Sequence, residues 1–172
     1  MPTMERTGWV TRDAVAELRQ QSFDDFFRVH RDPIFRAIAL TIGDRDLAAD
    51  ATDEAMVRTY ERWRRVRDYG NPPGWTYRVA LNWARSRQRR RKFRDDRPVP
   101  ELGEVDRSPS DPGLLAAVAG LPVEQRSVIV LRFLLDWSQD QIAEALDLPV
   151  GTVKSRTARA LERLRHMRGV QP

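Results

Sequence analysis

The feature that most constrains the fold is the stretch RDDRPVPELGEVDRSPSDPG at residues 94–113. It contains four prolines, two glycines and six acidic residues, and its few apolar side chains follow neither a helical nor a strand period. Such a composition is typical of a linker. The chain of 172 residues is therefore predicted to divide into an N-terminal domain at 22–94 and a C-terminal domain at 114–168, joined by an acidic linker at 95–113 and preceded by an extension at 1–21.

Both predicted domains show the apolar spacing of helices, and no window alternates with a period of two over enough residues to form a convincing strand. Hydrophobic residues make up 41% of the chain, which is enough for small helical cores but not for one large core. The predicted fold class is all-α: two small helical domains joined by a flexible linker, the C-terminal one a helix-turn-helix.

Composition also excludes several kinds of site. The sequence has no cysteine, so neither disulfides nor thiolate metal or redox chemistry is available. His30 lies at the edge of an aromatic face without a second ligand-type residue at suitable spacing, so we expect it to pack and predict neither metal nor cofactor. The N-terminal MPTMERTGWV lacks the apolar core of a secretion signal, and no apolar run approaches the roughly 20 residues of a membrane span. We expect a cytoplasmic protein.

The charge is distributed unevenly along the chain. Residues 1–94 carry 20 Arg or Lys against 13 Asp or Glu, residues 95–113 carry 2 against 6, and residues 114–172 carry 8 against 6. A basic chain indicates a polyanionic partner, but composition alone does not distinguish nucleic acid from anionic lipid.

Helix boundaries in the N-terminal domain follow from capping residues. A first helix is expected after Ser22, and Pro33 is expected to open a second one, PIFRAIALTI, which stops at Gly43. Asp44 can cap the next helix, RDLAADATDEAMVRTYERWRRV.

A helical wheel of that last segment separates two stripes. The core-facing stripe contains Ala48, Ala51, Ala55, Thr59 and Trp63. The other, which we call the acidic stripe, contains Asp46, Asp50, Asp53, Glu54 and Glu61, with Val57 among them. An ordinary solvated face is one interpretation. The concentration of acids within a basic domain favours a binding site for a basic protein surface.

The segment GWTYRVALNWARSRQRRRKFR follows a loop, RDYGNPP, and is strongly basic. The core-facing line predicted for it contains Trp75, Val79 and Trp83. A second line, which we call the polar line, contains Arg78, Asn82, Arg85 and Arg89. Guanidinium groups in a row on a rigid helix suit phosphate contacts, and Tyr77, which points elsewhere on the wheel, is the candidate for stacking on an unpaired base. A helix lying on a membrane is the alternative, but its apolar face would be short.

The C-terminal domain carries a helix-turn-helix pattern. Pro122 suits a first helical turn, and Ser138 with Gln141 forms a capping box for QDQIAEAL. The break DLPVG then leads into VKSRTARALERLR. Apolar side chains take the positions that close the motif, namely Ile142, Ala143, Leu146, Leu148 and Val153.

On the last helix, apolar residues and Thr157 face inward while small polar and cationic side chains face outward. The outward set, which we call the recognition face, contains Thr152, Lys154, Ser155, Arg156 and Arg159. Such a helix can enter a major groove, with arginine available for guanine and for phosphate. Some three-helix domains of this geometry bind proteins instead, but the cations favour DNA.

Taken in order, these motifs resemble a known family. An acidic helix DLAADATDEAMVRTYERW, a basic helix GWTYRVALNWARSRQRRR, an acidic linker, and LPVEQRSVIVLRFLLDWSQDQIAEALDLPVGTVKSRTARALERLR follow one another as in the extracytoplasmic-function (group IV) sigma factors of bacterial RNA polymerase. The resemblance covers residues 22–168, and WTYRVALN and LPVGTVKSR are its strongest elements.

The resemblance implies a role for each surface. The acidic stripe would dock on the coiled-coil of the largest polymerase subunit, and the flap would be a further contact. The loop at 68–74, including Asn71, and the following helix with Tyr77 and the polar line would engage the −10 element and capture a flipped base. The recognition face would read the −35 element, and the linker would thread through the RNA exit path. The protein itself would catalyse nothing and would take no small-molecule substrate.

Three positions depart from the family pattern: Asp147 stands where glycine is common, Thr157 replaces a large apolar residue, and GNPPGW replaces a Phe-containing approach to the tryptophan. Many relatives are restrained by an anti-sigma factor, although nothing in the sequence identifies one. The alternative function is a stand-alone helix-turn-helix regulator, which would leave the acidic stripe and the basic helix without a role. An RNA-remodelling enzyme has no support, because no phosphate-binding loop or nucleophile–base pair is found.

Overall fold

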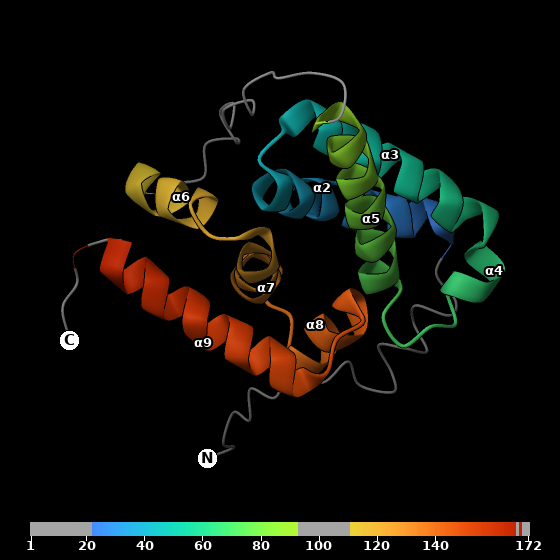
Figure 1. Cartoon of the computed structure of the whole chain (residues 1–172). Helices are drawn as coiled ribbons and strands as arrows, with labels where there is room; N and C mark the ends of the chain where they lie inside the picture. The colour runs from blue at the N-terminus through green and yellow to red at the C-terminus, as the bar shows by residue number, and fades with distance from the viewer. Residues whose placement is uncertain (1–21, 93–110, 168, 170–172) are drawn as a thin grey trace, which may run out of the picture.

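A computed structural model describes residues 22–92, 111–167 and 169 of the chain. Every regular element among these residues is an α-helix, which confirms the all-α prediction. The predicted extension at 1–21 and most of the predicted linker lie outside the described residues. The helices of the N-terminal unit are α2 (Phe23–Ile42), α3 (Arg45–Glu61), α4 (Trp63–Val66) and α5 (Pro72–Lys92). Those of the C-terminal unit are α6 (Pro112–Ala119), α7 (Val123–Phe133), α8 (Gln139–Leu146) and α9 (Val150–Met167) (Figure 1).

Helix α2 begins and ends at the predicted residues but is not interrupted. The Ser22 hydroxyl accepts a hydrogen bond from the Asp25 backbone N–H, and Gly43 closes the helix in the left-handed conformation with φ 73°. The expectation that Pro33 opens a separate helix is wrong. Phe26 before Pro33 and Ile38 after it are both fully buried in one core, so packing on either side keeps the helix continuous, while Pro33 itself is exposed.

Helix α3 starts at its predicted cap and ends earlier than expected. The Asp44 carboxylate accepts a hydrogen bond of 2.8 Å from the Leu47 N–H and a second of 3.0 Å from Arg91 of α5. At Arg62 the backbone leaves the helical conformation (φ −111°, ψ 13°), so the rest of the predicted helix becomes the short α4. The predicted core-facing stripe is otherwise confirmed, since Ala48, Ala51, Ala55 and Thr59 are buried and Trp63 is partly buried.

Helix α5 buries a different face from the predicted one. Tyr77 and Ala80 are fully buried, whereas Trp75, Val79 and Trp83 are only partly buried. The helical wheel allows for only one buried face of α5, but α5 contacts α2 and α3 of its own unit and also α8 of the C-terminal unit. The buried face is set by partners on α2 and α3: Tyr77 shares a hydrogen bond with Thr41, and Thr76 shares one with Thr59. A local pattern does not show these partners.

The helix-turn-helix of the C-terminal unit forms as predicted. Both hydrogen bonds of the capping box are present between Ser138 and Gln141. Helix α8 ends at Asp147, which takes the left-handed conformation with φ 55°, so the aspartate replaces the common glycine without changing the turn. Ile142 and Val153 are fully buried and close the angle between α8 and α9.

The two units lie against each other. Helix α7 occupies the middle of the molecule between α2 and α9, and α8 lies beside one end of α5 (Figure 1). The hydroxyls of Tyr77 and Thr41 share a buried hydrogen bond of 2.9 Å, and the Tyr77 ring meets Trp137 of the C-terminal unit edge-on at 6.2 Å. Val128 of α7 belongs to the same hydrophobic cluster. A continuous core therefore spans both units, so the expectation of separate small cores rather than one larger core is wrong.

Candidate functional site

The predicted acidic stripe lies together on the outer face of α3. Asp46, Asp50, Asp53, Val57 and Glu61 are exposed, and Glu54 is partly exposed. The opposite face of the helix is buried against α2 and α5. The carboxylates are thus held on a rigid helix, where they form one negatively charged surface.

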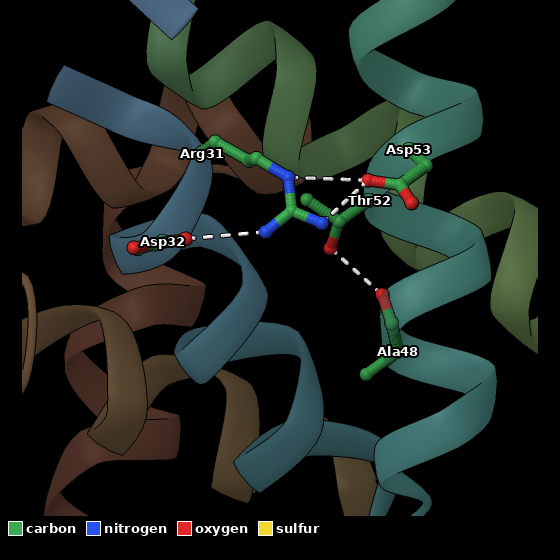
Figure 2. Close-up of polar contacts among 5 residues, drawn as sticks. All are labelled: Arg31, Asp32, Ala48, Thr52 and Asp53. Carbon is green, nitrogen blue, oxygen red and sulfur yellow. Dashed lines mark hydrogen bonds and ion pairs between the residues drawn. The ribbon is translucent and has the colours of Figure 1, made fainter. Parts of the chain in front are cut away.

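Two of these acids already have cationic partners. Arg31 of α2 donates to Asp53 at 2.8 Å and also to Asp32 at 3.1 Å (Figure 2). Glu54 pairs with Arg58 one turn later on α3 at 2.8 Å. Arg31 is 30% exposed and ties α2 to the middle of the stripe, so it orients the Asp53 carboxylate while leaving more than half of that side chain accessible.

An aromatic edge, which the sequence analysis missed, continues the stripe. Tyr60 is 65% exposed and Phe27 is 39% exposed. Their rings lie 5.1 Å and 6.1 Å from the Phe23 ring, which sits between them. Tyr60 follows Asp53 by seven positions on α3, so the helical period that defined the stripe could have found it.

A groove runs between the acidic stripe and α5. It has a volume of about 760 Å³ and is lined by residues of opposite charge on its two sides. The acidic side includes Asp50 and Glu54, and the basic side includes Arg87, which stacks over the Trp83 ring at 4.8 Å. The surface next to the stripe is therefore amphoteric rather than uniformly negative.

His30 packs as expected. Its ring lies 4.8 Å from that of Phe26, and burial lowers the pKa of His30 from its ordinary 6.5 to about 4. Among the described residues, no group of His, Cys, Asp or Glu is arranged to hold a metal ion.

The polar line of α5 turns toward the C-terminal unit. Arg78, Asn82 and Arg85 line a cavity of about 440 Å³ that we call the interunit cavity. Arg156 of the recognition face lines it from the other side. Arg89 is exposed and is not part of this cavity. The sequence predicted the line but not that it would face the helix-turn-helix.

The prediction that Tyr77 stacks on a base is wrong for this arrangement. Its side chain is fully buried, and burial raises the pKa of Tyr77 to about 12. The physical reason is that α5 buries a different face from the predicted one, as described above, which directs Tyr77 into the core.

Asn71 is also largely buried: its side-chain oxygen accepts from the Gly74 N–H at 2.9 Å and its amide nitrogen donates to the Gln141 carbonyl at 3.3 Å. Asn71 therefore caps the start of α5 rather than pointing outward.

Two other aromatic residues near the start of α5 are more accessible than Tyr77. Tyr69 is 40% exposed and Trp75 is partly buried, and their rings lie 6.2 Å apart. Together with Asn71, Arg78 and Glu144 they line a pocket of about 310 Å³, which we call the loop pocket. Aromatic walls beside a guanidinium suit an unstacked base. An aromatic residue in the loop before the basic helix was the available signal for Tyr69.

The recognition face lies on the side of α9 away from the core. Lys154, Ser155 and Arg159 are exposed, and Thr152 and Arg156 are partly exposed. The inward prediction is confirmed for Val153, Ala160 and Leu164, which are buried, whereas Thr157 and Leu161 are partly buried. The Thr157 hydroxyl donates to the Val153 carbonyl at 2.8 Å, which satisfies it within the helix.

Comparisons with known proteins agree on one family. A model described as sigma-70, region 4, matches residues 113–164. The chain is 32% identical over 148 residues to the RNA polymerase sigma-E factor of Streptomyces coelicolor, covering 83% of this chain and 84% of that protein. It is 32% identical over 152 residues to the ECF RNA polymerase sigma factor SigM of Mycobacterium tuberculosis, covering 86% and 78%.

Solved structures share the fold. The sigma factor RpoE from Bartonella quintana, solved in complex with the anti-sigma factor NepR, matches with a TM-score of 0.72 at 20% identity over 87% of this chain and 98% of that one. CnrH, solved in complex with the cytosolic domain of CnrY, matches with a TM-score of 0.62 at 19% identity over 94% of this chain and 98% of that one.

No helix within the described ranges is long and apolar enough to cross a membrane.

Proposed function

The chain belongs to the extracytoplasmic-function sigma factors of bacterial RNA polymerase, and from this premise we propose how its surfaces direct transcription initiation. It binds core polymerase and guides it to promoters by recognising −10 and −35 elements. The observation that carries the proposal is the presence, in one chain, of an acidic docking helix, an aromatic pocket beside an arginine line, and a helix-turn-helix.

The acidic stripe of α3 binds the coiled-coil of the largest polymerase subunit. Carboxylates held on a rigid helix attract a basic partner, while neighbouring apolar side chains supply the buried area that fixes a complex. Val57 and Tyr60 are exposed among the acids and are suited to that second task. The polymerase flap is the proposed contact of the C-terminal unit.

The loop pocket and the polar line together bind the −10 element after it opens. Tyr69 and Trp75 offer aromatic faces to a flipped base, and Arg78 and Arg85 follow along α5 two turns apart. Arginine contacts to phosphate fix the strand, while the pocket selects the base.

The recognition face of α9 reads the −35 element as a duplex. Small polar side chains at its start, including Thr152 and Ser155, allow the helix to approach base edges, and Arg159 is placed for guanine or phosphate. The protein acts in the cytoplasm, where core polymerase is found, and the polymerase performs the phosphoryl transfer. An anti-sigma factor is a further proposed partner.

In vitro transcription tests the proposal. Core polymerase, purified protein and a genomic promoter library are combined, and RNA start sites are mapped. We expect discrete start sites that disappear when the protein is omitted. If the protein binds duplex DNA but neither binds core polymerase nor produces start sites, the alternative of a stand-alone helix-turn-helix regulator replaces the proposal.

A further inference from the structure

The groove between the acidic stripe and α5, which we call the α3–α5 groove, has two walls of opposite charge. The α3 wall is lined by Asp50, Asp53 and Glu54, and the α5 wall by Arg87, Arg90 and Arg91. All three arginines are exposed. A docking site that attracts its partner through negative charge alone gives this basic wall no role.

The opposite charges are held apart by contacts outside the groove. Arg87 stacks over the Trp83 ring at 4.8 Å, and Arg91 pairs with Asp44, the cap of α3, at 3.0 Å. Glu54 pairs along its own helix, one turn further on. Among the described residues, no ion pair joins an acidic lining residue to a basic one. The groove therefore offers both charges to a partner instead of neutralising them internally.

Such a groove suits a protein helix better than a nucleic acid. A phosphate brought against Arg87 would enter a groove that Asp50 and Glu54 also line, and the carboxylates would repel it. A helix that carries basic residues on one side and acidic residues on the other satisfies both walls. Helices that dock in a groove between two others are a recurrent mode of recognition, and Val57 on the α3 wall supplies an exposed apolar contact.

We propose that the α3–α5 groove receives one helix of the polymerase coiled-coil, with Arg87 and Arg90 contacting carboxylates of that helix and Asp50 contacting a basic residue of it. This inference rests on the proposed function and extends its docking site from one helix to two. Two rows of opposite sign accept the partner helix in one direction and one register, which a uniformly acidic face would not determine.

The test measures binding of the full-length protein, dye-labelled at its N-terminus, to core polymerase without DNA by fluorescence anisotropy. The groove variant combines Arg87→Glu and Arg90→Glu. We expect it to bind core polymerase about 20-fold more weakly than the unmodified protein, because attractive contacts become repulsive. Docking through negative charge alone predicts the opposite, since the variant is more negative and would bind a basic partner more tightly.

A matched control makes the same change in charge elsewhere on the N-terminal unit. Arg64→Glu with Arg65→Glu alters exposed arginines of α4 that do not line the groove. We expect its affinity for core polymerase to change by less than about twofold, because solvent and salt screen charges outside the contact. Unchanged or tighter binding of the groove variant overturns the inference, and so does an equal loss in the control.

A neutral variant answers the same question if the glutamate side chains lower stability. Arg87→Gln with Arg90→Gln places no new carboxylate beside Asp50 and Glu54, and thermal unfolding followed by circular dichroism compares the stability of both variants. We expect the neutral variant to bind core polymerase about fivefold more weakly. If it binds core normally but its holoenzyme loses affinity for promoter DNA, these arginines contact phosphates and the inference is wrong.

The unmodified protein separates this inference from the proposed function. If it binds core polymerase and yields defined start sites while the groove variant binds core equally well, only the role of the α5 wall is wrong. If the unmodified protein itself does not bind core polymerase, the proposed function fails and the inference fails with it.

Discussion

Helices α5 and α9 both carry a cationic row, but their surroundings differ. On α9, Lys154, Ser155 and Arg159 face solvent. On α5, Arg78 and Arg85 face carboxylates across the interunit cavity. The same residue types on the same kind of element are therefore open in one half of the molecule and covered in the other. Availability for DNA depends on tertiary neighbours more than on the helix itself.

The comparison of α5 with α9 assumes that the protein docks on polymerase through the acidic stripe of α3 rather than through the polar line of α5 or the recognition face of α9. Asp50→Arg with Asp53→Arg should weaken core-polymerase binding by roughly 1,000-fold, about 4 kcal/mol, because two attractive charges become repulsive. Affinity for duplex DNA through α9 should not fall. Biolayer interferometry with immobilised core enzyme measures the first quantity. Asp24→Arg with Asp32→Arg makes the same change in charge at exposed acids of α2 outside the acidic stripe and should bind core normally; an equal loss there would remove the role of α3.

The strongest way to break the covered arrangement is through Arg126. Its guanidinium donates to the carbonyls of Thr41, Ala119 and Leu121, so Arg126→Met should lower the free energy of unfolding by about 3 kcal/mol. Urea unfolding followed by tryptophan fluorescence measures this. Arg132→Met, which loses a single bond to the Trp137 carbonyl, is the matched control and should cost about 1 kcal/mol. A loss of only about 2 kcal/mol, the value expected for the two bonds within the C-terminal unit, would mean that the bond between the units contributes nothing of its own.

Acid should destabilise the unit that carries α5 through one identifiable group. The pKa of His30 is about 4 in the folded chain and 6.5 ordinarily, so the unfolded chain takes up the proton first as the pH falls. This contribution to stability is complete above pH 6.5 and is lost between pH 6.5 and 4, by about 3 kcal/mol. Unfolding measured at both pH values should show a smaller difference in His30→Gln. His166→Gln, which replaces an exposed histidine near the end of α9, is the matched control.

The smallest expected effect sharpens the account of α9. Arg159→Ala should weaken binding to a −35 duplex by about tenfold, which is about 1.4 kcal/mol. Binding to a scrambled duplex should change less if the side chain reads bases. A loss of equal size on both sequences would show that Arg159 contacts phosphate only. Gel-shift titration of holoenzyme on both duplexes provides the measurement.

The sequence predicted well those features that short-range chemistry determines. Capping by Ser22, Asp44 and Ser138 depends on residues within one turn, and each cap forms as expected. The predicted outward placement of the acidic stripe and of Lys154, Ser155 and Arg159 is also observed, because α3 and α9 each present a single outer side. Asp147 adopts the left-handed conformation that its side chain tolerates.

The predictions that are wrong concern positions where contacts with segments distant in sequence determine the structure. The helical wheel places Tyr77 away from the predicted core-facing line, but its hydroxyl shares a buried hydrogen bond with Thr41 of α2, which is distant in sequence. The sequence pattern predicts that Pro33 starts a helix, but buried residues on both sides of it keep α2 continuous. The pocket lined by Tyr69 and Trp75 also takes in Glu144 of α8, which is distant in sequence. None of these contacts leaves a periodic signal in the chain.

The bond from Arg126 has one more consequence. Helix α2 has no basic residue in its last turn, so the charge that balances the negative end of its dipole is supplied by α7 through the Thr41 carbonyl. Any departure of the C-terminal unit would leave that end of α2 without its cation. Separation of the two units therefore carries an electrostatic cost at the end of α2, in addition to the loss of buried apolar contacts.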